Sequence, residues 1–289
     1  MRSVTVLAPA KLNLALDITG IADNGYHILD MVMQAVNLYE TITVRAANDL
    51  IIRMPGSTVP INEYNTAYKA ALAFFDETGI LTGADITVRK EIPIRAGMAG
   101  GSADAAGVLV ALNKLYNAKL SQEELCKIGL KIGADVPFSI LGGTARVQGI
   151  GDILLPIHSQ LKYWLCVCMP KKGISTRDAY ARYDEMGATK HPNCSAMVRD
   201  ISEGNLLGML PNVYNVLEET SSSKYNAPIR AILDENKALA SMMTGSGAAV
   251  FGIFTNRRSA SIARSALMRE YENIWLLHPI SKGVHILEQ

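Results

Sequence analysis

Residues 93–106 read PIRAGMAGGSADAA, a glycine-dense loop that opens a helix rich in small residues. Gly97, Gly100 and Gly101 let the backbone approach an anion closely and adopt positive φ without a steric penalty. Together with the first turn of the following helix, the loop would offer free amide N–H groups and the positive end of the helix dipole. The segment therefore predicts a phosphate-binding site.

The loop matches neither of the two commonest nucleotide-binding patterns. It lacks the Gly-Lys-Ser/Thr ending of a P-loop, and it lacks the spacing and the early position of a dinucleotide-binding loop. A different phosphate-binding family is implied. Taken alone, the loop also fits a glycine-rich turn between a strand and a helix, so other segments must decide.

Length and charge bound the possible functions. A chain of 289 residues exceeds what one core usually organises, which predicts two domains, residues 1–156 and 157–289. The net charge is +1, and Lys and Arg are not clustered in any stretch. Binding to a phosphate backbone needs clustered cations, so we expect no nucleic-acid partner.

Cysteine spacing and the N-terminal sequence point to an ordinary reduced protein. The four cysteines show no metal-ligand spacing, and Cys166 and Cys168 alternate along an apolar run, which places both on one face of a strand as buried thiols. The N-terminal segment MRSVTVLAPAKLNL has no apolar stretch long enough for a signal peptide or a membrane span. We therefore expect a cytoplasmic protein without a membrane partner.

Strand and helix patterns alternate in the first half of the chain. Period-two alternation predicts strands over 4–8, 11–18, 40–46 and 84–88. Helices are predicted over 65–77 and 102–116, and a capping box of Ser121 and Glu124 starts another that ends near Gly133. The first half is thus predicted to be an α/β domain.

The second half begins after the glycine-punctuated stretch LGGTARVQGIGDILLPI, residues 141–157. An apolar strand is predicted over 163–169. Its later elements are predicted as helices over 176–186, 193–201, 227–239 and 257–271 and strands over 248–254 and 273–277. This order suits a second α+β layer.

Two segments near the N-terminus carry candidate binding groups. In PAKLNL, residues 9–14, alternation places Lys11 and Asn13 on the face opposite Leu12 and Leu14, although a lysine there could equally be a solvated surface charge. In DNGYH, residues 23–27, a turn leads to an aromatic ring and an imidazole, a pair able to stack on a base and to hydrogen-bond its edge.

Two later segments are also candidates. In GADVPF, residues 133–138, Asp135 is either a helix cap or a partly buried carboxylate, held ionised by a cation such as Lys11 and able to orient or deprotonate an alcohol. In MTGSGAA, residues 243–249, a second glycine turn is either a hairpin connection or a further phosphate contact.

In combination these motifs resemble the GHMP kinases, named for galactokinase, homoserine, mevalonate and phosphomevalonate kinases. The resemblance rests on five segments in order: PAKLNLALDITG, DNGYH, IPIRAGMAGGSADAAGVL, GADVPFSILGGTARVQGIGD and MTGSGAAVF. It covers essentially the whole chain. It implies an α+β fold of two domains, an N-terminal α/β domain and a C-terminal ferredoxin-like domain, with the active site in the cleft between them.

The resemblance also implies the reaction. The γ-phosphoryl group of ATP would pass to the tertiary 2-hydroxyl of a methylerythritol unit carried on cytidine diphosphate, a step of non-mevalonate isoprenoid biosynthesis. The family's catalytic lysine and aspartate fall on Lys11 and Asp135. Asp135 would take or orient the hydroxyl proton, and Lys11 would offset the charge that develops in the transition state.

ATP and its companion magnesium ion are placed by the same resemblance. The nucleotide would lie over the glycine loop, with Ser102 near metal-bound oxygens and Asn65 near the adenine. The residues expected to line its phosphates are Pro93, Ile94, Arg95, Ala96, Gly97, Met98, Ala99, Gly100, Gly101, Ser102 and Ala103. The loop departs from the family pattern only at Met98-Ala99, and this change removes no proposed chemical group.

The cytidine side would be carried by Asn13, Tyr26, His27 and Tyr180. Tyr180 is placed from the Ser-Thr-x-x-x-Tyr arrangement of residues 175–180. A cytosine held between Tyr26 and Tyr180, with His27 reading its edge, would explain the need for a cytidine handle.

Three alternatives keep the fold and change the function. One is another GHMP kinase, acting on mevalonate, phosphomevalonate or homoserine, and a second is the family's diphosphate decarboxylase. Residues 25–27, Gly-Tyr-His, argue against both, because substrates without a base do not use a stacking aromatic and an edge-reading imidazole. The third is a nucleotide sensor without turnover, against which the intact Lys11 and Asp135 weigh.

Overall fold

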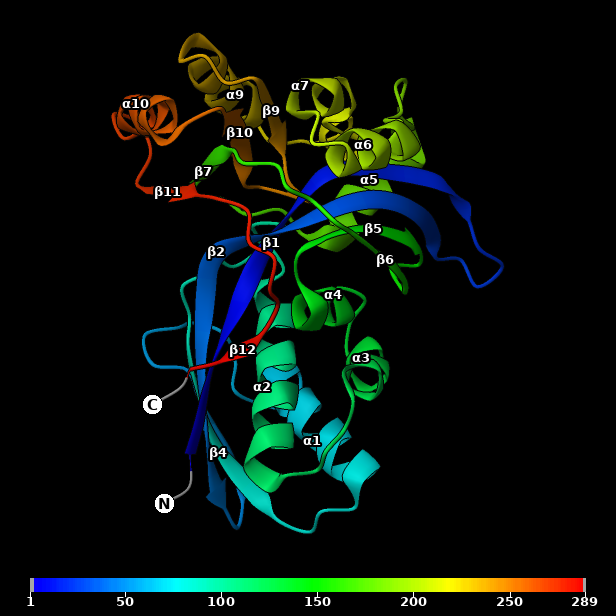
Figure 1. Ribbon diagram of the computed structural model, residues 1–289, viewed down its shortest axis with the longest axis vertical. Helices are drawn as coiled ribbons and strands as arrows, with labels where there is room; N and C mark the ends of the chain where they lie inside the picture. Colours follow the sequence, from blue (N-terminus) through cyan, green and yellow to red (C-terminus); the bar gives the residue numbers. More distant parts are fainter. Residues whose placement is uncertain (1–2, 288–289) are drawn as a thin grey trace.

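The computed structural model describes residues 3–287, so residues 1, 2, 288 and 289, at the outer ends of the two predicted domains, lie outside the described residues. Two β-sheets organise the chain, with helices packed against each of them (Figure 1). The larger sheet has eight strands, and the smaller has four. The mixed α+β, two-layer character expected from the sequence is confirmed.

A long, bent pair of antiparallel strands forms the spine of the larger sheet. These are β1 (Ser3–Ile21) and β2 (His27–Ala47), which bend together as they leave the helix-covered half of the molecule (Figure 1). Their register shifts between Pro9 and Ala10 and between Asn13 and Ala15. Such bulges bend a strand and increase its twist, which lets one ribbon serve both halves of the molecule.

Further strands extend the larger sheet at both of its ends. Its main path runs β12-β1-β2-β4-β3, while β5 pairs with β2, β6 with β5, and β8 with β1. The added strands are β3 (Leu50–Arg53), β4 (Gly83–Arg89), β5 (Thr144–Gly149), β6 (Ile153–Ile157), β8 (Tyr214–Asn215) and β12 (His285–Ile286). The predicted boundary after residue 156 stays a prediction; it falls in β6, and the later strands β8 and β12 pair back onto β1.

Among the described residues, four helices belong to the first half of the chain: α1 (Thr66–Thr78), α2 (Gly100–Tyr116), α3 (Gln122–Leu130) and α4 (Val136–Leu141). The central one, α2, lies against β1 and β2 (Figure 1). Small residues let it approach the sheet closely, because a Cβ on Gly107 would lie 2.5 Å from Ile42 Cδ1. This contact sets how closely α2 packs on the sheet.

The smaller sheet has the strand order β11-β7-β10-β9 and is antiparallel throughout. Its strands are β7 (Trp164–Met169), β9 (Ala240–Met243), β10 (Val250–Phe254) and β11 (Asn273–Leu277). Numbered within this sheet, the order is 4-1-3-2, which is that of a ferredoxin-like fold. The expected C-terminal architecture is therefore present.

The helices of the second half are α5 (Thr176–Met186), α6 (Cys194–Ser202), α7 (Leu206–Met209), α8 (Val216–Glu219), α9 (Asn226–Glu235) and α10 (Arg257–Leu267), with a 3-10 turn at Leu210–Asn212. α9 and α10 contact the smaller sheet, whereas α6 contacts β2 of the larger one. Cys166 and Cys168 are fully buried in the core that α9 and α10 share with the smaller sheet, as predicted.

Several predicted boundaries were wrong for local reasons. The strands expected over 4–8 and 11–18 are one strand, because the bulge at Pro9/Ala10 bends it without ending it. The helix expected over 227–239 ends at Glu235, two residues before Lys237, which adopts a left-handed φ of 68°. The helix expected over 257–271 ends at Leu267, and the one expected to end near Gly133 ends at Leu130.

Candidate active site

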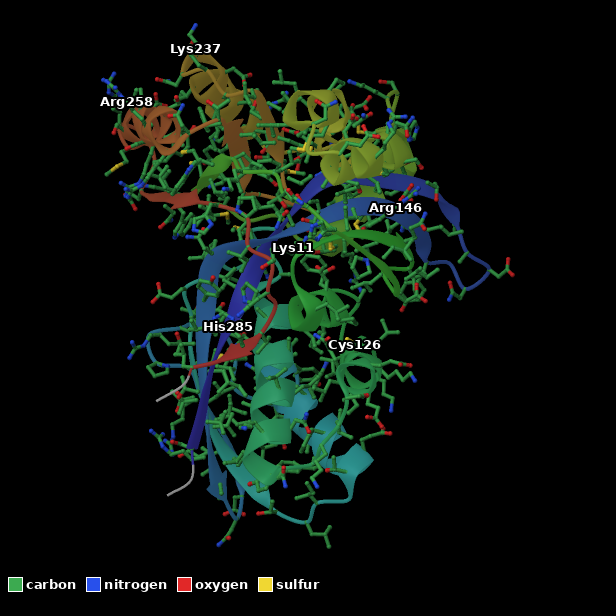
Figure 2. The ribbon with its side chains drawn as sticks, in the orientation of Figure 1. Lys11, Cys126, Arg146, Lys237, Arg258 and His285 are labelled. Carbon is green, nitrogen blue, oxygen red and sulfur yellow. The ribbon has the colours of Figure 1, made fainter. Side chains whose placement is uncertain are left out.

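One cavity of about 880 Å³ brings together residues from both halves of the chain. Its lining includes the glycine loop, residues of β1 and β2, the two residues before α4, and residues 174–176, 180 and 245–246. Lys11 lies where the two halves meet (Figure 2). Every residue that the sequence nominated for the site lines this cavity except Ala103.

The glycine loop is held by backbone contacts to the later glycine turn. Ala248 N donates to Arg95 O and Ala249 N to Ala96 O, both over 3.1 Å. Gly97 has a φ of +74°, and a Cβ there would lie only 2.1 Å from Thr244 O. The turn at residues 243–249 therefore supports the glycine loop from behind, and its Gly245 and Ser246 also reach the cavity.

Helix α2 points its uncapped N-terminus at the cavity. Its N-cap residue is Ala99, which has no side chain able to accept from the first amides. The amides of the first turn therefore keep their donor capacity for an anion, and the helix dipole adds positive potential. Ala103 differs from the other nominated loop residues: it is fully buried, and its amide already donates to Ala99 O, so its predicted place beside the phosphates stays a prediction.

Lys11 and Asp135 meet across the cavity. Lys11 Nζ lies 3.8 Å from Asp135 Oδ2. The lysine side chain is only 6% exposed, and that of the aspartate is 31% exposed. Asp135 stands at the N-cap position of α4, but its side chain makes no capping bond, so the carboxylate faces the lysine. Burial lowers the pKa of the Lys11 ammonium, and the nearby Asp135 carboxylate opposes this shift.

Asn13 holds Lys11 in place. The Lys11 ammonium donates to Asn13 Oδ1 over 2.6 Å, and Asn13 Nδ2 points to the sulfur of Met31 at 3.3 Å. The Asn13 backbone amide donates to Thr244 Oγ1 over 2.9 Å. The side chain lines the cavity, but its amide oxygen is already used by the lysine, so the predicted contact with cytidine stays a prediction.

Asn65 has a local structural task at its place on the cavity wall. Its Oδ1 accepts from Ala67 N over 2.9 Å and caps α1, while its Nδ2 donates to Pro60 O over 2.6 Å. Ser102, on the first turn of α2, is partly exposed and also lines the cavity. The proposed adenine and metal contacts of these two residues stay predictions.

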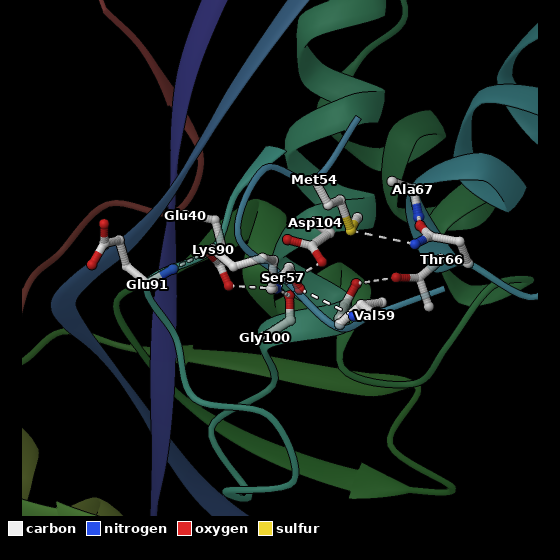
Figure 3. A network of polar contacts seen from close by, with 12 residues as sticks. Glu40, Met54, Ser57, Val59, Thr66, Ala67, Lys90, Glu91, Gly100 and Asp104 are labelled. Carbon is white, nitrogen blue, oxygen red and sulfur yellow. Dashed lines mark hydrogen bonds and ion pairs between the residues drawn. The ribbon is translucent and has the colours of Figure 1, made fainter. Parts of the chain in front are cut away.

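A buried charge cluster beneath the loop was missed from the sequence. Lys90 Nζ lies 2.5 Å from Glu40 Oε1 and 2.8 Å from Asp104 Oδ2 (Figure 3). Glu40 also accepts from Glu91 N over 2.7 Å, which anchors the start of the loop. Burial raises the pKa of the Glu40 carboxyl, and it raises that of Asp104 to about 7.

Three of the predicted cytidine residues, Tyr26, His27 and Tyr180, also line this cavity. Tyr26 is 64% exposed, whereas the His27 side chain is only 16% exposed. The rings of His27 and Tyr180 lie 4.8 Å apart at 39°. The sequence did not point to a second partner of this imidazole: His27 Nε2 lies 2.6 Å from Asp184 Oδ1.

Within residues 3–287, no group of three or more His, Cys, Asp or Glu side chains is arranged to hold a metal ion by itself. Magnesium is commonly bound by one or two carboxylates together with substrate phosphates, so this arrangement is compatible with a metal that arrives with a nucleotide. No helix in the same part of the chain is long and apolar enough to cross a membrane.

Comparison with known proteins gives consistent matches along the chain. The model of the GHMP kinases N terminal domain matches residues 65–143, and that of the GHMP kinases C terminal matches residues 209–273. A 4-diphosphocytidyl-2-C-methyl-D-erythritol kinase of Clostridium botulinum is 40% identical over 276 residues, covering 94% of this chain and 99% of the relative. Its counterpart in Alkaliphilus metalliredigens is 38% identical over 295 residues, covering 100% and 97%.

Solved structures agree with these relatives. A crystal structure of 4-(cytidine 5'-diphospho)-2C-methyl-D-erythritol kinase superposes with a TM-score of 0.80 at 29% identity, covering 96% of this chain and 99% of that one. A homoserine kinase from Cytophaga hutchinsonii superposes with a TM-score of 0.81 at 17% identity, covering 99% and 98%, which shows the shared fold alone.

The chain therefore belongs to the GHMP kinase family and is an ATP-dependent kinase. Its near-full-length relatives place it, within that family, among the 4-diphosphocytidyl-2-C-methyl-D-erythritol kinases. The family and the fold expected from the sequence are confirmed.

Proposed function

We propose that this protein transfers the γ-phosphoryl group of ATP to the 2-hydroxyl of 4-diphosphocytidyl-2-C-methyl-D-erythritol, with Lys11 and Asp135 as the catalytic pair. The observation that carries the proposal is their 3.8 Å approach inside the cavity that the glycine loop also lines. The uncapped amides at the start of α2 would bind the phosphates of ATP. The γ-phosphoryl group and the 2-hydroxyl would then meet beside Lys11 and Asp135.

Asp135 would orient the substrate hydroxyl and accept its proton, since its carboxylate makes no capping bond to α4. Lys11 would offset negative charge on the transferring group and on the attacking oxygen. Asn13 holds the ammonium by its 2.6 Å hydrogen bond and so limits where that charge can lie. Magnesium, when bound with ATP, would supply charge neutralisation at the phosphate oxygens, and Ser102, on the cavity wall at the first turn of α2, is the residue proposed to lie near it.

The cytidine end of the substrate would lie against Tyr26, His27 and Tyr180, which line the same cavity. Stacking on Tyr26 and Tyr180 would hold the base, while His27 contacts its edge. The small-molecule substrate would thus be anchored by its base at one end and phosphorylated at the other.

The test is an ATP-consumption assay with the purified protein and three acceptors: 4-diphosphocytidyl-2-C-methyl-D-erythritol, mevalonate and homoserine. We expect consumption with the first alone. Turnover of mevalonate or homoserine at a comparable rate would instead assign the protein to another branch of the family.

A further inference from the structure

The imidazole of His27 is fixed by a carboxylate that stands outside the cavity. His27 is the first residue of β2 and lines the cavity, whereas Asp184 lies on α5 and is not among the cavity-lining residues. His27 Nε2 and Asp184 Oδ1 are 2.6 Å apart. The contact joins two segments 157 residues apart in the sequence, at the end of the cavity assigned above to cytidine.

Helix α5 holds the ring from three directions. Tyr180, Tyr183 and Asp184 are spaced i, i+3 and i+4, so their side chains share one helix face. Tyr180 lies 4.8 Å from the imidazole at 39°, and Tyr183 meets it edge-on at 6.3 Å and 81°. The imidazole therefore has little freedom to rotate or flip.

The Asp184 contact also decides which ring nitrogen carries hydrogen. An ionised carboxylate can only accept a hydrogen bond, so Nε2 must donate. In the neutral ring the other nitrogen, Nδ1, then carries a lone pair and can only accept. Within residues 3–287, the one hydrogen bond of the His27 side chain is that of Nε2 with Asp184, so Nδ1 has no protein donor, and His27 lines the cavity.

We propose that Asp184 is a positioning residue that sets the tautomer of His27 and so makes this kinase select cytosine over uracil. The two bases differ at position 4, where cytosine has an amino donor and uracil has a carbonyl acceptor. An accepting Nδ1 satisfies the cytosine amino group, but it opposes the uracil oxygen lone pair to lone pair. The inference rests on the proposed function for the location of the base.

A purely structural ion pair predicts a different outcome. If Asp184 only tied α5 to the β1–β2 hairpin, its loss would weaken cytidine and uridine ligands equally. If it sets the tautomer, its loss frees the ring to take the other tautomer, whose Nδ1–H donates to uracil as readily as the original accepts from cytosine. The ratio of the two affinities is therefore the informative quantity.

The experiment measures binding of CDP and UDP to the whole protein by calorimetry, for the unchanged chain, Asp184→Ala and Glu185→Ala. Glu185 is the matched control, because it is the next residue on α5, carries the same charge and is exposed. We expect the preference for CDP over UDP to fall about 10-fold in Asp184→Ala, as loss of one hydrogen bond to a base edge allows. Glu185→Ala should keep the preference of the unchanged protein.

An unaltered CDP-to-UDP ratio in Asp184→Ala overturns the proposal, whether or not both affinities fall. Equal binding of CDP and UDP by the unchanged protein overturns it as well. The proposed kinase function is judged separately, by turnover of the unchanged protein with its full substrate. Failure of either idea can therefore be told apart from failure of the other.

Nitrogen-15 NMR of the histidine side chains gives a second readout that a structural role would not move. The His27 signal, assigned by its loss in His27→Gln, should show the Nε2–H tautomer in the unchanged protein. In Asp184→Ala it should shift toward a mixture of the two tautomers. An Nδ1–H tautomer in the unchanged protein would refute the inference directly.

Discussion

Gly97→Ala tests whether the phosphate loop is shaped by its contact with the later glycine turn. A Cβ on Gly97 would lie 2.1 Å from Thr244 O and 3.0 Å from Gly247 N, both of which are backbone atoms that cannot swing aside. Side chains do not approach a backbone oxygen so closely, so loop and turn must separate by about 1 Å.

The expected loss of stability has two parts. A left-handed φ of +74° disfavours alanine by about 1–2 kcal/mol. Separation of loop and turn also breaks the two 3.1 Å bonds from Ala248 N and Ala249 N, at about 0.5–1.5 kcal/mol each. The free energy of unfolding should therefore fall by about 2–5 kcal/mol.

Gly79→Ala isolates the first part. Gly79 ends α1 with a φ of +65°, and nothing lies within 4 Å of the position its Cβ would take. The free energy of unfolding of this variant should fall only by the cost of placing alanine at a left-handed φ, about 1–2 kcal/mol, and its kinetics should stay normal. The difference in stability between the two variants measures the cost of the contact between the Gly97 Cβ and Thr244 O.

Denaturant unfolding and steady-state kinetics with varied ATP make the comparison. Gly97→Ala should also lose about 100-fold in kcat/KM for ATP, since a displacement near 1 Å is enough to spoil phosphate positioning. The reasoning is refuted if Gly97→Ala is no less stable than Gly79→Ala and retains normal kcat/KM for ATP.

Three further changes test other parts of the site. Asp135→Asn should leave ATP affinity nearly unchanged in binding measurements and lower kcat by at least about 100-fold, so a near-normal kcat would remove Asp135 as base or orienter. Tyr26→Ala should weaken binding of the cytidine substrate by about 1–3 kcal/mol, because stacking on the ring is lost, and the Kd should rise accordingly. An unchanged Kd would show that the Tyr26 ring does not stack on the base. The pKa of the Asp104 carboxyl is raised to about 7 in the folded protein, so the folded state holds this proton more tightly than the unfolded state, and the free energy of unfolding should fall as pH rises from about 4 to 7. Asp104→Asn should flatten the free energy of unfolding over this pH range. A pH profile parallel to that of the unchanged protein would contradict this prediction.

Some candidate residues show in a local sequence pattern. The glycine loop and its helix, Lys11 and Asp135 could all be nominated in this way, because glycine spacing and an isolated charge among apolar neighbours are visible within a few residues; the structure brings them to one cavity, and their roles stay predictions. Their 3.8 Å approach could not be derived from those patterns, since it depends on how β1 and the start of α4 pack. The resemblance to a family supplied that step in advance.

Residues that act through tertiary contacts left no comparable signal. Glu40, Lys90 and Asp104 come from a strand, a loop entry and a helix, and each looks like an ordinary surface charge in its own segment. The contact of Asp184 becomes visible only in the structure, where Asp184 and Tyr180 lie on the same face of α5 and both contact His27. In each case the missing information was the packing of one element on another.

The bend in β1 explains both a failed prediction and the site itself. Register shifts at Pro9/Ala10 and Asn13/Ala15 bracket the two polar residues Lys11 and Asn13. A strand without bulges alternates strictly between its two faces, and a slip of one residue would turn both side chains to the other face. Because the bulges re-aim this short segment, Lys11 is buried yet reaches Asp135. Removing one residue at either bulge should therefore separate Lys11 from Asp135 even where the sheet still forms.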